Sequence, residues 1–221
     1  MSPAVCRSPS EGRDVSETIL IADDHPLFRQ ALALAVGNVA PGARVVEVGT
    51  LTAAAKAVAD IADLRLIMLD LKMPGAIGYS GIALLHAERP DVPILVVSSA
   101  EGAKVAEEAR AFGAVGFLRK DVDLPRIEDA IRVALGGQAA PAVQAEPVDQ
   151  VRREVAGLTP TQLKVLLAVL DGKLNKQIAY DLGMSEATVK AHMTAIMRKL
   201  DVQNRTQAAL IARSLGLDLI N

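Results

Sequence analysis

The chain has 221 residues, enough for one or two domains with hydrophobic cores of their own. Hydrophobic residues make up 51% and charged residues 23%, a balance that excludes wholesale disorder. Aromatic residues make up only 2%, so the core must be aliphatic, and binding of single-stranded nucleic acid by base stacking is disfavoured.

Charge is unevenly distributed along the chain. The net charge is −2, but residues 1–137 carry 14 Lys and Arg against 18 Asp and Glu, whereas residues 158–221 carry 8 against 5. An acidic first part and a basic last part are expected when a cation-binding module is joined to a polyanion-binding module, although chance unevenness gives the same totals.

The first residues form a polar leader, residues 1–17, without an apolar segment of signal-peptide length. The leader contains Cys6, the single cysteine, which permits no internal disulfide and fits a reducing compartment. No apolar run approaches the roughly 20 residues that a membrane span needs. We therefore expect a soluble, cytoplasmic protein with no membrane partner.

Between residues 18 and 137, short apolar runs alternate with longer amphipathic segments. Four of the five short runs are almost continuously apolar, which is typical of parallel strands buried on both faces. The alternation predicts the doubly wound α/β class: a five-stranded parallel sheet with helices on both faces and sites at the carboxyl ends of the strands. The predicted strands are 18–22, 44–48, 66–69, 94–97 and 115–118, and the predicted helices are 27–36, 53–61, 82–88, 105–112 and 126–135.

A stretch rich in Gly, Ala and Pro follows the last of these helices and lacks periodicity, so residues 138–156 are predicted to be a linker. Only helices are predicted from residue 157 to residue 221, which makes this part a small all-α domain. The expected helices are 160–170, 176–182, 186–200 and 206–214.

The helical part has start signals at each helix. Thr159 precedes a first-turn proline, Ser185 is an expected N-cap, Asn175 can cap the second helix, and Asn204 or Arg205 lies just before the fourth. Gly183 closes the second helix and opens a short turn into the third. Two helices joined in this way are a helix-turn-helix, although an ordinary helical hairpin gives the same pattern.

Three acidic residues stand at predicted strand ends. Asp23 and Asp24 follow the first strand, and Asp70 ends the third. These ends are neighbours in a doubly wound sheet, so the carboxylates should converge, and a hard divalent cation such as Mg²⁺ would offset their repulsion. An ordinary polar loop is the alternative for any one of these acids taken singly.

Two more polar residues point to the same edge of the sheet. Ser98 ends the fourth strand and Lys120 follows the fifth. A hydroxyl and an ammonium beside a metal-bound carboxylate suit a phosphoryl group in transfer, and Asp70 is then the candidate nucleophile that forms an acyl phosphate. The acid pair, the lone acid, the hydroxyl and the lysine each stand at the end of a different strand, which favours one site over unrelated polar loops.

Four segments, IADDHPLFR (21–29), MLDLKMPG (68–75), VVSSA (96–100) and GFLRKD (116–121), together resemble the receiver domain of bacterial response regulators. The resemblance covers about residues 17–137, and we place the receiver at 18–137. It implies Asp70 as phosphoacceptor and Asp23 and Asp24 as Mg²⁺ ligands, with the backbone carbonyl of Lys72 as a further ligand. It also implies roles for three residues that contact the phosphoryl group or switch with it: Ser98, Lys120 and the aromatic Phe117.

The chain departs from the receiver pattern near the predicted pocket. The stretch 79–81 adds a residue or two before the predicted third helix, and Asp121 stands where many receivers have proline. Lys72 occupies a position that tunes the lifetime of the phosphoryl group in the family, in a direction that the sequence does not give.

The segments 158–166, 175–193 and 199–208 closely resemble the LuxR/FixJ-type DNA-binding domain, over about residues 157–217. The resemblance implies a four-helix domain that binds double-stranded DNA with helix 186–200 in the major groove. Val189, Ile196 and Leu200 fall at helical spacing and should face the core. The residues left on or near the open face are Thr188, Lys190, Ala191 and Thr194.

These open positions have different expected contacts with DNA. Lys190 can reach a guanine edge or a phosphate, and Ala191 can touch a thymine methyl group. Relatives often carry a longer polar side chain where Thr194 stands, so discrimination here rests more on Lys190. Further phosphate contacts, for which a solvated surface charge is the alternative, are predicted at Lys176, Lys199 and Arg205.

Two other features of the helical part have open interpretations. His192 lacks a cluster of Cys or carboxylate partners, so packing or a phosphate contact is favoured over zinc binding. The last helix presents small apolar residues, and in this family that helix forms the dimer contact, although it can equally close the core of its own domain. Those residues are Ala208, Ala209, Ile211 and Ala212.

Taken together, the resemblances imply a transcription regulator that is switched by phosphorylation and has no enzymatic activity beyond its own phosphorylation and dephosphorylation. The implied partners are a sensor histidine kinase or phosphorelay protein, a second copy of the chain on activation, double-stranded DNA and RNA polymerase. One alternative is a Mg²⁺-dependent aspartyl-phosphate phosphohydrolase, but those enzymes typically have a second acid where Lys72 stands. Another is a receiver-like regulator that works without phosphorylation.

Overall fold

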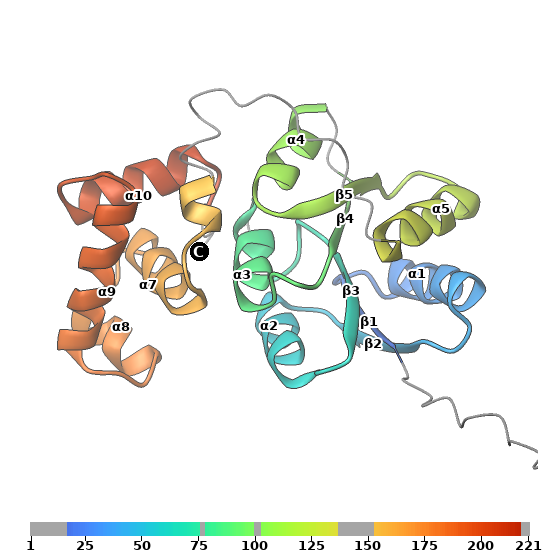
Figure 1. The fold of residues 1–221 in the computed structure, drawn as a ribbon, viewed down its shortest axis with the longest axis horizontal. Coiled ribbons are helices and arrows are strands. Elements are labelled where there is room, and N and C mark those ends of the chain that lie inside the picture. The colour runs from blue at the N-terminus through green and yellow to red at the C-terminus, as the bar shows by residue number, and fades with distance from the viewer. Residues whose placement is uncertain (1–16, 76–77, 100–102, 137–152, 218–221) are drawn as a thin grey trace, which may run out of the picture.

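The computed structural model describes residues 17–75, 78–99, 103–136 and 153–217 (Figure 1). The predicted leader with Cys6 and most of the predicted linker lie outside these residues. The described chain forms an α/β unit followed by a helical unit. No helix in this part of the chain is long and apolar enough to cross a membrane.

The α/β unit is built on a five-stranded parallel sheet, in which the strands lie in the order β2-β1-β3-β4-β5. The chain order reverses between β1 and β3, which is where sites form in this class of sheet. The predicted doubly wound α/β fold is therefore confirmed. The strands are β1 (Thr18–Ala22), β2 (Arg44–Val48), β3 (Leu64–Leu69), β4 (Ile94–Ser98) and β5 (Ala114–Arg119).

Helices cover both faces of the sheet because the central strands are apolar on both sides. In β1, Leu20 packs into the core beneath α2 and α3, whereas Ile19 and Ile21 pack into the core beneath α1 and α5. Figure 1 shows these two layers on opposite sides of the sheet. The helices are α1 (Pro26–Val39), α2 (Leu51–Asp60), α3 (Ser80–Glu88), α4 (Ala103–Ala111) and α5 (Leu124–Leu135).

Helix α3 begins at Ser80, two residues before the predicted start. The stretch 79–81 is therefore the N-cap and first turn of α3 and not an addition before it. The first six residues of the helix are all buried. Such a helix has no polar face to mark its start, because the sheet covers one side and the helical unit covers another.

The main helices of the helical unit are α7 (Pro160–Leu170), α8 (Asn175–Asp181), α9 (Glu186–Lys199) and α10 (Arg205–Ser214). Residues 153–156, at the end of the predicted linker, are also helical, and Val155 is fully buried in the core. Thr159 caps α7 in a capping box, and Ser185 and Asn204 cap α9 and α10 through their side chains, as predicted. The core positions Val189, Ile196 and Leu200 are buried, which confirms the orientation predicted for α9.

Asn175 does not cap α8, so that prediction is wrong. Asn175 is the first residue of the helix, and the N–H of Leu174 is satisfied by the side chain of Gln177. The Asn175 side chain instead accepts a long hydrogen bond of 3.4 Å from Arg205. The side chain of Asn175 therefore bonds to a residue distant in sequence instead of capping its own helix.

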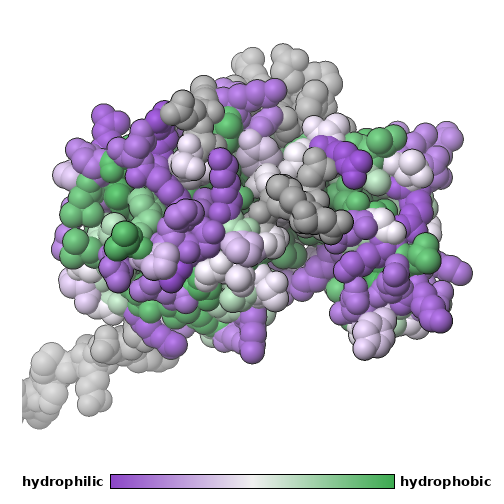
Figure 2. Space-filling view, turned by 180° about the vertical axis from the view of Figure 1, so that it is seen from behind, coloured by the Kyte–Doolittle hydropathy of each residue, from purple (hydrophilic) through white to green (hydrophobic). Residues whose placement is uncertain are grey.

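The two units pack against each other through α3 and α7. Buried apolar residues of both units belong to one continuous cluster, and Lys164 of α7 lies 3.6 Å from the carboxylate of Glu88 in α3. Figure 2, seen from behind, shows the two units as two lobes, with the helical unit on the right.

Candidate phosphoacceptor pocket and DNA-binding face

The three predicted acids lie together at the reversal of strand order. Asp23 follows β1 and Asp70 follows β3, with exposed fractions of 1% and 2%, and Asp24 is partly exposed. One carboxylate oxygen of each acid and one ring nitrogen of His25 lie within 4.8 Å of one another. The backbone N–H of Asp70 donates to the carbonyl of Ala22 at 2.8 Å, which holds the two strand ends at this distance.

Lys120 enters the same pocket from the end of β5. Its Nζ lies 2.6 Å from Oδ2 of Asp23 and 2.8 Å from Oδ2 of Asp70. Burial disfavours the charged ammonium and is the largest single effect on its pKa, but hydrogen bonds and charge attraction from the two acids together outweigh it and raise the pKa. Lys120 is therefore a cation at neutral pH, and it also lies 4.9 Å above the ring of Phe28.

Backbone and side-chain hydrogen bonds set the orientation of the acids. The N–H of His25 donates to Oδ1 of Asp23 at 2.7 Å, and the N–H of Lys72 donates to Oδ1 of Asp70 at 3.1 Å. Arg29, one turn into α1, donates to the carbonyl of Asp23 at 2.6 Å and to Glu47 at 3.2 Å. Sequence reasoning missed His25 and Arg29, although both stand in the segment that contains the acid pair.

The donor set of the pocket suits a divalent cation. Among the described residues, two buried side-chain oxygens lack a hydrogen bond of acceptable geometry: Oδ2 of Asp23, which has only the ion pair with Lys120, and Oδ1 of Asp24, which lies 2.6 Å from Nδ1 of His25. Buried carboxylate oxygens with unused lone pairs are the ligands that Mg²⁺ prefers. The acidic cluster is therefore compatible with Mg²⁺ binding.

The two predicted switch residues lie on neighbouring strands. Ser98 is fully buried at the end of β4, at the same edge of the sheet as Asp70, and its carbonyl accepts from the N–H of Lys120 at 3.0 Å. Phe117 of β5 pairs with Val96, two residues before Ser98, and lines a surface hollow between α4 and α5. Their roles, and that of the Lys72 carbonyl, stay predictions.

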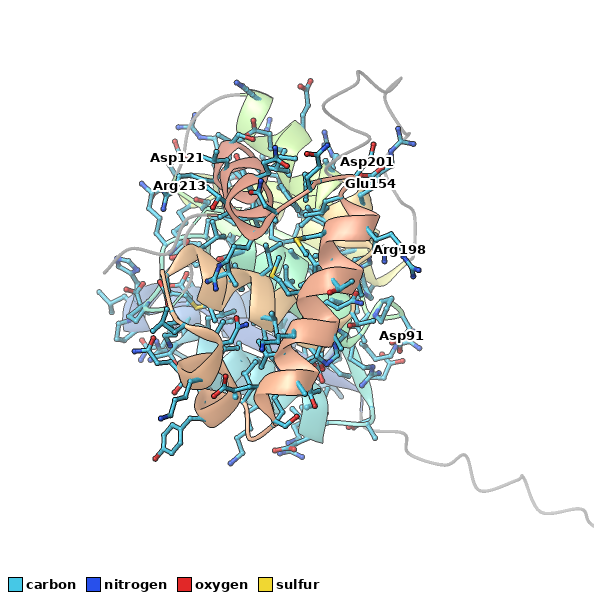
Figure 3. The ribbon with its side chains drawn as sticks, turned by 90° about the vertical axis from the view of Figure 1, so that its left-hand side faces the viewer. Asp91, Asp121, Glu154, Arg198, Asp201 and Arg213 are labelled. Atoms are coloured by element: carbon cyan, nitrogen blue, oxygen red, sulfur yellow. The ribbon has the colours of Figure 1, made fainter. Side chains whose placement is uncertain are left out.

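Helix α9 presents the predicted DNA-reading residues to solvent. Thr188, Lys190, Ala191 and Thr194 are all exposed. The helix lies on the side of the helical unit that faces away from the sheet, and Figure 3 looks directly onto it. Arg198, labelled there, projects from the same helix; it is exposed and was missed by sequence reasoning, although its spacing of four from Thr194 and seven from Ala191 places it on the same face.

The three predicted phosphate contacts differ in the structure. Lys176 is exposed on α8. Lys199 instead donates to the carbonyl of Gly157, and Arg205 donates to the carbonyl of Lys173 at 2.9 Å. The last two therefore link elements of their own unit, and contact with phosphate would require them to exchange these partners.

The apolar residues of α10 divide between the core and the surface. Ala208 and Ala212 are fully buried in the core of their own unit, so a dimer contact through these two residues is ruled out in this arrangement. Ala209 and Ile211 are only partly buried, and Leu210 is 59% exposed. Ala209 and Ile211, of the four predicted dimer residues, therefore stay accessible on α10, beside the exposed Leu210.

Comparison with known proteins identifies the family to which each of the two units belongs. Residues 19–132 match the family model of the response regulator receiver domain, and residues 156–212 match that of the bacterial regulatory proteins of the luxR family. The glycerol metabolism activator of Pseudomonas putida is 41% identical over 207 residues, 88% of this chain and 94% of the relative. The nitrate/nitrite response regulator NarP of Escherichia coli is 32% identical over 203 residues, 87% of this chain and 93% of the relative.

Solved structures agree with the sequence relatives. The receiver domain of a NarL response regulator from Mycobacterium tuberculosis is 27% identical with a TM-score of 0.50, over 56% of this chain and 98% of that one. The RcsB response regulator of Salmonella typhimurium shares the fold over 90% of this chain and 98% of its own, with 22% identity and a TM-score of 0.51. The chain therefore belongs to the transcriptional response regulators that join a receiver domain to a LuxR-family DNA-binding domain.

Proposed function

We propose that Asp70 accepts a phosphoryl group from a sensor histidine kinase or phosphorelay protein, and that this modification controls dimerisation and sequence-specific DNA binding. The observation that carries the proposal is the pocket itself: Asp70 is buried beside Asp23 at the reversal of strand order, with Lys120 hydrogen-bonded to it at 2.8 Å. Buried acids beside a charged lysine in a crevice are typical of a functional site.

Phosphotransfer needs a carboxylate that can act as a nucleophile. One oxygen of Asp70 forms a bond to phosphorus while the bond from phosphorus to the donor's histidine nitrogen breaks and the nitrogen keeps the electron pair. Lys120 lies on the Oδ2 side of Asp70, and the N–H of Lys72 contacts Oδ1. Lys120 would then pair with the oxygens of the new phosphoryl group, where charge accumulates in transfer.

Asp23, Asp24 and Asp70, with the carbonyl of Lys72, are the residues that would hold Mg²⁺. When bound, the ion would offset the combined charge of the acids and the phosphoryl group. On this proposal the chain catalyses nothing beyond its own phosphorylation and dephosphorylation, and the stand-alone phosphohydrolase becomes the weaker reading, since it leaves the helical domain without a role.

The DNA-reading surface is proposed to be the exposed face of α9. Lys190 and Ala191 stand near the start of this face and would read base edges, while Arg198 near its end would contact phosphate. Dimerisation would place two such helices on neighbouring half-sites.

The test compares the parent chain with Asp70→Ala, with and without beryllofluoride and Mg²⁺ as an acyl-phosphate mimic. In the parent, the mimic should raise the mass in solution to that of a dimer and tighten binding to duplex DNA; in Asp70→Ala it should change neither. Asp60→Ala, an exposed acid at the end of α2, is the matched control and should respond like the parent. A parent that binds DNA equally well untreated would favour a receiver that regulates without phosphate.

A further inference from the structure

The receiver touches the DNA-binding domain at two glycine residues. Gly78 precedes α3 and Gly216 follows α10, and both have positive φ, +55° and +75°. A Cβ atom added to Gly78 would lie only 2.0 Å from the carbonyl oxygen of Gly216. The two backbones can therefore approach this closely only because Gly78 has no side chain.

Tyr79 joins the two backbones. Its N–H, at the N-cap of α3, donates to the carbonyl of Gly216 at 3.2 Å. A Cβ added to Gly216 would lie 3.2 Å from Cδ2 of the Tyr79 ring, closer than ordinary packing allows. The DNA-binding domain thus supplies the partner for an N–H at the start of a receiver helix, where a helix has none of its own.

The side chain of Tyr79 is held by α4 on the receiver side. Its hydroxyl lies 2.5 Å from Oε2 of Glu108, and its ring stacks on Phe112, just after α4, with centroids 5.5 Å apart and planes 11° apart. Tyr79 is 8% exposed and Phe112 is fully buried. A shift of α4 would therefore move the Tyr79 ring, and the ring contacts Gly216.

Two of the strands that end at the pocket, β3 and β4, are followed in the chain by the helices that hold Tyr79. Tyr79 is the N-cap of α3, which follows β3 and Asp70, and α4 follows β4, which ends at Ser98. A change around the phosphoacceptor can thus reach the domain contact through α3 and α4. The ion pair of Lys164 with Glu88 and the packing of α7 on α3 support the same contact from its other side.

We propose that Gly78, Tyr79 and Gly216 form an interdomain joint that docks the DNA-binding domain on the receiver in the unphosphorylated chain, and that Tyr79 couples α4 to this joint. Helix α9 faces outward while the joint is closed, so docking controls how the DNA-binding domain is oriented for pairing rather than whether α9 is covered (Figure 1). The proposed docking of the two domains does not depend on phosphorylation, whereas the proposed coupling of α4 to the joint through Tyr79 rests on the proposed function.

The joint is tested with matched glycine substitutions in the full chain. Gly78→Ala and Gly216→Ala each place a methyl group in the contact. Gly75→Ala and Gly172→Ala are the controls: both glycines have positive φ, +85° and +76°, but a Cβ on Gly75 meets nothing closer than 3.5 Å and one on Gly172 meets nothing within 4 Å. All four variants introduce the same kind of backbone strain, and only Gly78→Ala and Gly216→Ala also place a methyl group in the contact between the domains.

Hydrogen exchange at the Tyr79 amide and the radius of gyration from X-ray scattering are the readouts. Gly78→Ala and Gly216→Ala should raise exchange at Tyr79 by about tenfold relative to their controls and enlarge the particle. If either variant matches its control in both readouts, the joint does not hold the domains and the proposal fails, whatever phosphorylation does.

Coupling is tested by Tyr79→Phe, which keeps the ring and the backbone contact but loses the hydrogen bond to Glu108, and by Glu108→Ala, which removes the same bond from α4. With beryllofluoride and Mg²⁺, the parent should lose protection at Tyr79, and both variants should lose less. An equal loss in the variants overturns the coupling. A parent that does not respond to the mimic contradicts the proposed function, while the glycine comparison still decides the joint.

Discussion

Replacing Lys120 with methionine is expected to slow phosphotransfer to Asp70 by roughly 100- to 1000-fold, the usual loss when one charge-stabilising donor is removed from a reaction site. The same change should destabilise the fold in the absence of a divalent cation. Lys120 contacts both Asp23 and Asp70, which are buried, so methionine leaves two neighbouring carboxylates without their cation. Removing one partner of a buried ion pair costs about 3 kcal/mol.

Mg²⁺ should restore most of this stability, because a cation held by the acids replaces the missing charge. Urea unfolding of Lys120→Met and the parent, in EDTA and in Mg²⁺, measures both effects. Methionine retains an apolar stem beside Phe28, which keeps packing loss small. Lys104→Met, at a lysine that is 84% exposed, is the control and should unfold like the parent. Equal midpoints for Lys120→Met and the parent in EDTA would show that the ion pairs contribute nothing to stability.

Replacing Lys190 with alanine is expected to weaken binding to a specific duplex by about 1–3 kcal/mol, or roughly 5- to 150-fold, and to reduce discrimination against other sequences. Lys190 is exposed in the first half of α9, where recognition helices contact base edges. Arg198→Ala should behave differently. A phosphate contact positions the protein without reading sequence, so this variant should weaken all duplexes alike.

The two roles are separable by salt titration. A duplex selected by the parent chain from a random pool, and a scrambled version of it, serve as probes for the beryllofluoride-treated protein. Arg198→Ala should lower the slope of log affinity against log salt by about 1 on both duplexes. Lys190→Ala should reduce the difference in affinity between the selected and the scrambled duplex. Lys56→Ala, at an exposed receiver lysine, should change neither the salt slope nor this difference. If this difference in affinity is unchanged in Lys190→Ala, Lys190 does not read the DNA sequence.

Much of the fold could be predicted because its signals are local. Parallel strands covered on both faces must be apolar throughout, and β1, which is buried along its whole length, has the predicted bounds. Helix starts with side-chain caps at Thr159, Ser185 and Asn204 were predictable because a cap involves only residues within one turn. The meeting of Asp23, Asp24 and Asp70 followed from the rule that polar residues at neighbouring strand ends share one edge of a parallel sheet.

What could not be predicted depends on partners distant in the chain. Asn175 pairs with Arg205 of another helix instead of capping its own, and α3 begins where Gly216 supplies a carbonyl to Tyr79. Composition could not separate the core residues Ala208 and Ala212 from the surface of α10, because small apolar side chains fit both environments.

The sequence by itself determined the class of fold, the acids of the pocket and the lysine that pairs with them, because each follows from a short-range pattern. It also determined which residues of α9 are exposed, because helical spacing separates them from the core positions. Only the tertiary structure decided which cationic side chains already have partners within the protein, which face of α10 is exposed and how the DNA-binding domain packs on the receiver. These outcomes depend on contacts between segments that the chain brings together only when both domains are folded.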